Sequence, residues 1–193
     1  MRCRAPDVDA HLAHFEALYA ANGDPWHARA GRDEALKRRA IGYALGGTVL
    51  ARGLEIGCGN GVSTRALARR FLRLAAVDGS AGAVALAKQE IGECSRVCVF
   101  QRTLPCVLPR QRFDAIVASE ILYYLPRHEL DVMLNAGYDA LRRGGYFIST
   151  HHTRRFGDAE CTHATLVEKT RKIFGHERRQ LSGFGWRCYL HVR

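Results

Sequence analysis

Short apolar stretches alternate with amphipathic stretches along most of this 193-residue chain. The apolar stretches predict strands at Gly53–Ile56, Leu74–Val77, Arg96–Gln101, Phe113–Ala118 and Tyr146–Thr150. The amphipathic stretches between them predict helices at Val62–Phe71, Ala81–Ile91 and Arg127–Leu141. Strands that alternate with helices are joined by right-handed crossovers in a mostly parallel sheet. Helices then cover both faces of that sheet, so we expect an α/β fold, a three-layer αβα sandwich.

The two ends of the chain carry other patterns. Near the start, helical spacing predicts helices at Asp9–Ala21 and from Arg32 to about Ala44. Near the end, a helix is predicted at Thr162–Phe174, followed by strands at His176–Leu181 and Trp186–Val192 that a Gly-containing turn joins. Such a hairpin would complete a seven-stranded sheet with an antiparallel edge. We expect one domain over residues 1–193, with a helical cap or lid at 1–47 and the core at 48–193.

The composition narrows the class of protein. Hydrophobic residues make up 47% of the chain and charged residues 25%, as in ordinary soluble globular proteins. No apolar stretch approaches the roughly 20 residues that cross a bilayer, and the start of the chain lacks the apolar region of a secretory signal. Seven irregularly spaced cysteines are typical of reduced thiols in a cytoplasmic protein and form no zinc-binding pattern. The net charge of +10 favours anionic partners, which keeps nucleic acid as an alternative.

A glycine-rich turn follows the first predicted core strand. Gly57, Gly59 and Gly61 allow a tight turn and a close approach of the backbone to a ligand, and Asp78 ends the next strand. A carboxylate at that position can bind both hydroxyls of a ribose. The spacing G-x-G-x-G differs from the dinucleotide fingerprint, and Glu55 would repel a pyrophosphate. The turn therefore favours S-adenosylmethionine, which carries a ribose and cationic groups but no phosphate, over a nicotinamide cofactor.

Glu55, the three glycines, Asp78 and the later strands together resemble the class I S-adenosylmethionine-dependent methyltransferases over about residues 24 to 193. Within that class, Asp24-Pro25-Trp26, the stretch LEIGCGNG and the stretch FDAIVASEILYYL are similar to the nodulation protein S group of N-methyltransferases. The resemblance implies a Rossmann-like core, S-adenosylmethionine as cofactor, and a small-molecule or saccharide amine as methyl acceptor. An oxygen acceptor, an RNA or protein substrate, and a binding module without catalysis remain the alternatives.

The resemblance also implies a cofactor site. Its predicted residues are Trp26, Glu55, Gly57, Cys58, Gly59, Gly61, Asp78, Gly79, Ser80, Thr103, Leu104, Ser119 and Glu120. One of them departs from the family pattern, because many relatives have an Asp where this chain has Thr103. A Thr hydroxyl can still accept a hydrogen bond from the adenine amino group, but without a full charge.

Three residues are predicted to carry chemistry: Glu120, Tyr123 and His151. Glu120 follows the fourth strand and would anchor or deprotonate an amine, unless it binds a backbone amide or the N-terminal segment. Tyr123 would form part of an aromatic wall or pack in the core. His151 and His152 alternate across the end of the fifth strand, so only one can face the site. No metal is expected, and the chain lacks the N-P-P-aromatic motif of methyltransferases that act on DNA base amines.

Overall fold

The computed structural model describes residues 6–154 and 156–193. It contains a seven-stranded sheet in the order β3-β2-β1-β4-β5-β7-β6. The first five strands are parallel, and β7 pairs antiparallel with both β5 and β6. The strands are β1 (Leu50–Ile56), β2 (Phe71–Asp78), β3 (Val97–Gln101), β4 (Phe113–Ser119), β5 (Leu141–His152), β6 (Arg179–Gly183) and β7 (Trp186–Val192). The predicted mostly parallel sheet with an antiparallel hairpin is confirmed.

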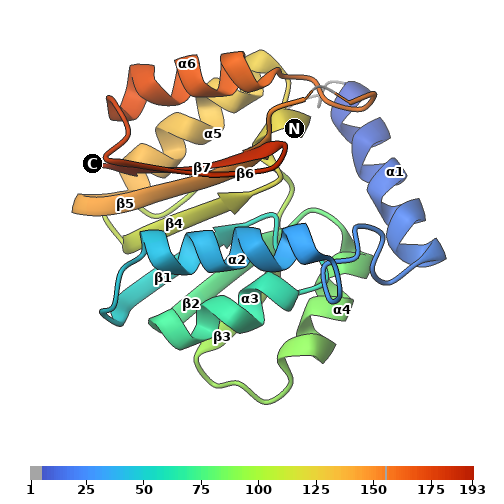
Figure 1. Ribbon diagram of the computed structural model, residues 1–193. Helices are drawn as coiled ribbons and strands as arrows, with labels where there is room; N and C mark the ends of the chain where they lie inside the picture. The colour runs from blue at the N-terminus through green and yellow to red at the C-terminus, as the bar shows by residue number, and fades with distance from the viewer. Residues whose placement is uncertain (1–5, 155) are drawn as a thin grey trace.

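Helices cover both faces of the sheet (Figure 1). The helices are α1 (Pro6–Ala21), α2 (Arg32–Ala44), α3 (Val62–Leu67), α4 (Ala81–Ile91), α5 (Arg127–Ala140) and α6 (His163–Phe174). Helices α5 and α6 form one outer layer, while α2, α3 and α4 form the other (Figure 1). No helix in the described ranges is both long and apolar enough to span a bilayer.

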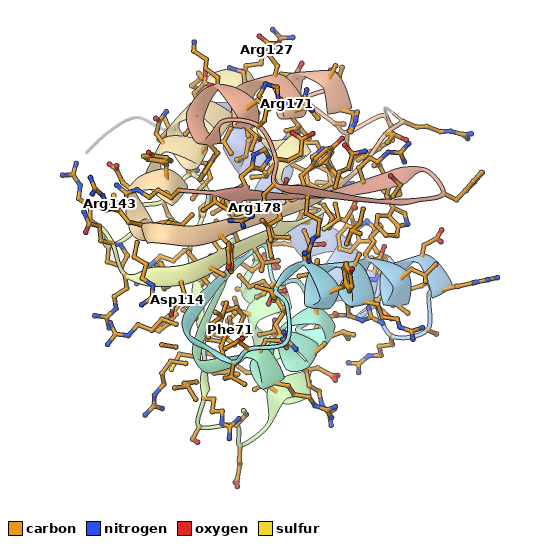
Figure 2. The ribbon with its side chains drawn as sticks, turned by 60° about the vertical axis from the view of Figure 1, so that its left-hand side comes forward. Phe71, Asp114, Arg127, Arg143, Arg171 and Arg178 are labelled. Atoms are coloured by element: carbon orange, nitrogen blue, oxygen red, sulfur yellow. The ribbon has the colours of Figure 1, made fainter. Side chains whose placement is uncertain are left out.

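The helix predicted to reach Phe71 ends earlier. Helix α3 stops at Leu67, a short 3-10 turn follows at Ala68–Arg70, and Phe71 begins β2. Phe71 is fully buried on the α2 and α3 side of the sheet, where Figure 2 labels it. A Cβ atom at Gly53 of β1 would lie 2.7 Å from the Phe71 ring, so the strand pair accommodates this large side chain only because residue 53 is glycine.

The strand bounds also differ at the C-terminal edge. Strand β6 is Arg179–Gly183 rather than the predicted His176–Leu181, because Gly175 ends α6 with φ +78° and the chain needs residues 176–178 to turn back. Strand β5 is longer than predicted and extends from Leu141 to His152, paired with β4 and then with β7. The longer strand carries both terminal histidines within the sheet.

Helix α1 stands across the ends to which the parallel strands point (Figure 1). Its Glu16 accepts hydrogen bonds from the Ser80 hydroxyl at 2.9 Å and from the backbone N–H groups of Ala81 and Gly82 at the start of α4. The carboxylate thus satisfies free N–H groups of that helix end. Residues 1–5 of the expected cap lie outside the described residues, and the division into cap and core stays a prediction.

Candidate active site

The glycine turn has the backbone that only glycine adopts easily. Gly57, Gly59 and Gly61 have φ values of +73°, +53° and +84°. A Cβ atom on Gly57 would lie 2.6 Å from Ile121, and one on Gly61 would lie 2.7 Å from the backbone of Ala87. Both glycines are therefore also required by close packing. Gly61 supports the turn against α4, while Gly57 and Gly59 line a cavity.

Asp78 ends β2 beside this turn. One carboxylate oxygen accepts the N–H of Gly59 at 2.8 Å, and the other accepts the N–H of Ser80 at 3.0 Å. Burial raises the pKa of this carboxyl, while backbone hydrogen bonds lower it in part. A carboxylate offers about four lone-pair positions, so Asp78 can hold the turn and still accept from two ligand hydroxyls.

Glu55 is buried beneath the turn, with 1% of its surface exposed. Its Oε2 atom has no hydrogen-bond partner among the described residues, although Glu55 lines the cavity. Burial, together with the neighbouring charge of Asp78, raises the pKa of the Glu55 carboxyl from 4.5 to about 8. With this pKa the carboxyl is mostly protonated at neutral pH. A cationic ligand group beside it would lower the pKa and so favour the carboxylate.

Two cavities meet at the Asp78 carboxylate. The first has a volume of about 150 Å³ and is bordered by the predicted residues Trp26, Glu55, Gly57, Cys58, Gly59, Asp78, Ser119, Glu120 and Tyr123. The second has a volume of about 80 Å³ and is bordered by the predicted residues Asp78, Gly79, Ser80, Thr103 and Leu104. Leu12, Ile121 and Leu125 make the second cavity largely apolar, as a flat heteroaromatic ring would require.

The Asp24-Pro25-Trp26 segment is fixed to the glycine turn. Asp24 accepts hydrogen bonds from the N–H groups of Ala28 and Arg29 and from the Asn60 side chain, the last at 2.9 Å. Asn60 also donates to the Gly23 carbonyl at 3.1 Å. Trp26 follows directly and meets the Tyr19 ring at an angle of 65°. These contacts hold the tryptophan at the wall of the first cavity.

Glu120 also lines the first cavity and has a left-handed backbone conformation with φ +57°. Such a conformation costs a non-glycine residue on the order of 1 kcal/mol and is found at functional sites. Tyr123 donates its hydroxyl to Glu120 Oε2 at 2.8 Å. The Lys37 ammonium lies 3.1 Å from Oε1, and Nε2 of His152 lies 3.4 Å from Oε2. Glu120 is thus the centre of a polar group of four side chains.

The structure does not bring His151 to this cavity, so that part of the prediction is wrong. On β5, Phe147 packs towards α5 and α6, whereas Ile148 packs towards α2. His151 shares the side of Phe147, where its ring stacks on Tyr189 and meets His163. His152 shares the side of Ile148 and lines the cavity. The strand alternation noted in the sequence therefore selects the second histidine of the pair.

The burial of His151 predicts acid instability. Burial lowers the pKa of His151 from 6.5 to about 3, so the unfolded chain binds a proton below pH 6.5 that the folded protein does not. The free energy of unfolding contributed by this residue is complete above pH 6.5 and is lost as the pH falls towards 3, by about 1.4 kcal/mol per pH unit. His151→Phe should remove this loss, giving a relative gain of about 2–3 kcal/mol at pH 4.5 in urea unfolding. The exposed His176→Gln control should keep the wild-type slope, and an unchanged slope in His151→Phe would contradict the assignment.

Sequence reasoning missed several cavity residues. Lys37 sits within a run of charged helix residues that reads as a solvated face, yet only 2% of its surface is exposed. Tyr19 and Phe15 follow ordinary amphipathic spacing in α1. Asn60 lies between two glycines of the turn and belongs to no motif of its own. All four depend on the placement of α1 and α2 over the strand ends, which residue spacing does not encode.

Comparisons with known proteins agree with this geometry. A family model described as a methyltransferase domain matches residues 54–145. The chain is 32% identical to nodulation protein S of Sinorhizobium fredii over 116 aligned residues. This alignment covers 60% of this chain and 52% of that protein. The chain thus matches about half the length of this curated relative.

Solved structures show the same fold. The N-methyltransferase NodS of Bradyrhizobium japonicum in complex with S-adenosyl-L-homocysteine has a TM-score of 0.85 at 21% identity, over 94% of this chain and 97% of that one. Magnesium protoporphyrin IX methyltransferase of Synechocystis with bound S-adenosylmethionine has a TM-score of 0.74 at 14% identity, over the full length of both chains.

Residues 54–145 thus match a methyltransferase-domain model, and the sheet has the class I methyltransferase fold, as the glycine turn and strand alternation predict. Within this class the chain is similar to nodulation protein S, as the Asp24-Pro25-Trp26 and SEILYYL segments predict. The predicted resemblance is confirmed at both levels.

Proposed function

We propose that this protein is an S-adenosylmethionine-dependent methyltransferase whose acceptor is the amine of a small molecule or a saccharide. The observation that carries the proposal is the continuity of one cavity from the glycine turn and Asp78 to the polar group around Glu120. A cofactor at the first end and an acceptor at the second would face each other. Proximity and alignment of this kind supply much of the rate of such a transfer.

The residues present fit the cofactor. Asp78 would accept the ribose hydroxyls, and the unpartnered Glu55 oxygen would meet a cationic group of the methionine part. Thr103 and the apolar wall of the second cavity would take the adenine ring. When bound, S-adenosylmethionine supplies a methyl group already activated by the sulfonium charge.

The charges at the cavity favour an amine over a phosphate-bearing acceptor. In the described part of the chain, the acidic side chains Asp24, Glu34, Asp78 and Glu120 line the first cavity against the single lysine Lys37, and Glu55 adds a further charge only when a cation binds beside it. The basic residues responsible for the +10 charge are spread elsewhere, for example Arg127 on α5 and Arg143 on β5, which lie at different edges of the molecule in Figure 2. A general basic surface thus surrounds an acidic interior, which counts against RNA as the substrate.

A matched panel of sugars tests the acceptor. With S-adenosylmethionine present, we expect glucosamine to release S-adenosyl-L-homocysteine, whereas N-acetylglucosamine, whose nitrogen is blocked, and glucose, which has only hydroxyls, should not. Simple diamines extend the amine arm to acceptors that are not sugars. Mass spectrometry of the product locates the added methyl group.

Each alternative has its own outcome. Transfer to glucose would identify an oxygen acceptor. Transfer to RNA with binding that weakens steeply with salt would identify a nucleic-acid enzyme. Calorimetric binding of S-adenosylmethionine without transfer to any amine, alcohol, carboxylate or RNA would indicate a binding module. Absence of S-adenosylmethionine binding would overturn the proposal as a whole.

A further inference from the structure

The polar group at the acceptor end has a specific hydrogen-bond order. The Lys37 side chain of α2 is buried, and its ammonium has three N–H donors. Three possible acceptor atoms lie near it: Glu34 Oε1 at 2.7 Å, Glu120 Oε1 at 3.1 Å and His152 Nε2 at 3.4 Å. A lysine ammonium donates and cannot accept, so Nε2 of His152 has to present its lone pair towards Lys37. The other ring nitrogen, Nδ1, lies 3.3 Å from the Gly185 carbonyl and donates to it. An imidazole with its proton on Nδ1 satisfies both of these contacts.

The same ring has a partner for its other protonation state. Nε2 also lies 3.4 Å from Glu120 Oε2, which accepts but cannot donate when ionised. A proton on Nε2 would point to that carboxylate. Glu120 would therefore accept from the charged form of His152, whereas Lys37 donates to its neutral form. Since 43% of the side chain is exposed, a proton taken up at Nε2 can reach solvent.

Glu120 itself is poorly placed to take a proton. Its Oε2 accepts the Tyr123 hydroxyl, and its Oε1, which has no hydrogen-bond partner among the described residues, lies 3.1 Å from the Lys37 ammonium, whose charge disfavours protonation there. In the described part of the chain, three further neighbours of His152 direct no charge towards Nε2. The Phe156 ring meets it edge-on at 6.0 Å, Arg154 lies over Phe184 of the hairpin, and His151 faces the opposite side of the sheet.

We propose that His152 takes the proton from the acceptor amine, and that Lys37 and Glu120 position it for this step. The inference depends on the proposed function. The acceptor ammonium gives one N–H proton to Nε2, leaving a neutral nitrogen with a free lone pair. That lone pair forms the N–C bond to the methyl group while the C–S bond breaks and its electrons stay on sulfur. The methylated product leaves as an ammonium, and the imidazolium, held by Glu120, returns its proton to solvent.

The first test needs no acceptor. With ring-¹⁵N-labelled histidine at pH 8, NMR of the wild type should show His152 protonated at Nδ1. Lys37→Met keeps the length of the side chain but removes the donor, so the proton should move to Nε2, where Glu120 accepts it. Lys88→Met, on the distant helix α4, should leave the His152 signals unchanged. A wild-type His152 protonated at Nε2 would overturn the inference.

The second test measures turnover with the best amine of the sugar and diamine panel. His152→Gln should lower kcat by about 100-fold or more and remove the acid limb of the pH profile, with the KM of the amine little changed. His176→Gln, an exposed histidine at the opposite end of the sheet, should behave as wild type. A His152→Gln enzyme with wild-type kcat and pH profile would overturn the role of His152 while leaving the proposed function standing. A wild type that binds S-adenosylmethionine but methylates no amine would instead contradict the proposed function.

Discussion

Replacing Asp78 with alanine should weaken the binding of S-adenosylmethionine by about 10- to 100-fold, because each lost hydrogen bond to a charged group is worth roughly 1.5–3 kcal/mol. The substitution removes the proposed ribose contacts and also frees the Gly59 and Ser80 N–H groups that Asp78 now holds. Isothermal titration calorimetry with S-adenosyl-L-homocysteine, which cannot react, measures the effect.

Asp78→Asn separates the two roles of this side chain. Asparagine keeps the shape but offers one acceptor oxygen, so it should bind the ligand more weakly than wild type and more tightly than alanine. The exposed Asp33→Asn variant on α2 is the matched control and should bind normally. Wild-type affinity in Asp78→Ala would exclude Asp78 from the cofactor site.

Glu55→Gln should stabilise the ligand-free protein at alkaline pH and impair ligand binding at the same time. The folded-state pKa of about 8 lies above the ordinary value of 4.5, so the folded protein holds a proton that the unfolded chain has released. The free energy of unfolding contributed by Glu55 is complete below pH 4.5 and is lost as the pH rises to 8. Glutamine has no such loss, so the substitution should raise the free energy of unfolding at pH 9 by about 5 kcal/mol relative to the wild type.

Urea unfolding at pH 5 and pH 9 checks this prediction. The two proteins should differ little at pH 5 and clearly at pH 9, and the exposed Glu93→Gln control should follow the wild type at both. Calorimetry at pH 8 should show weaker binding of S-adenosylmethionine to Glu55→Gln, because the carboxylate that pairs with a cation is gone. A stability difference that does not change with pH would show that Glu55 is ionised in the folded protein.

The parts of the site that can be predicted from the sequence are those formed by residues close together along the chain. The glycines, Glu55 and Asp78 follow from short stretches in which a turn and two strand ends are fixed by local geometry. The prediction of His151 rather than His152 is wrong because period-2 alternation gives opposite faces without saying which face carries the cavity. That choice depends on α2, a helix more than a hundred residues away, whose Lys37 meets His152.

The errors in the fold have a similar cause. Phe71 fits the helical spacing of the preceding residues, and a fully buried strand start is revealed only by the empty space that Gly53 leaves on the neighbouring strand. The predicted start of β6 is wrong because Gly175, with its positive φ, ends α6 and the strand begins only at Arg179. The starts of β2 and β6 both depend on pairing with a neighbouring strand. The sequence of one segment alone does not specify which strand it pairs with.

The contacts of Glu16 have a consequence for exchange at the site. Helix α1 borders the second cavity through Leu12 and Phe15, and its only charged link to α4 in the described structure is the Glu16 carboxylate at the α4 N-terminus. If the adenine ring binds in that cavity, any movement of α1 away from α4 that widens it would break these hydrogen bonds. The Glu120 end of the first cavity is bordered instead by Glu34 and Lys37 of α2 and by His152 of β5, so the two parts of the site rest on different helices.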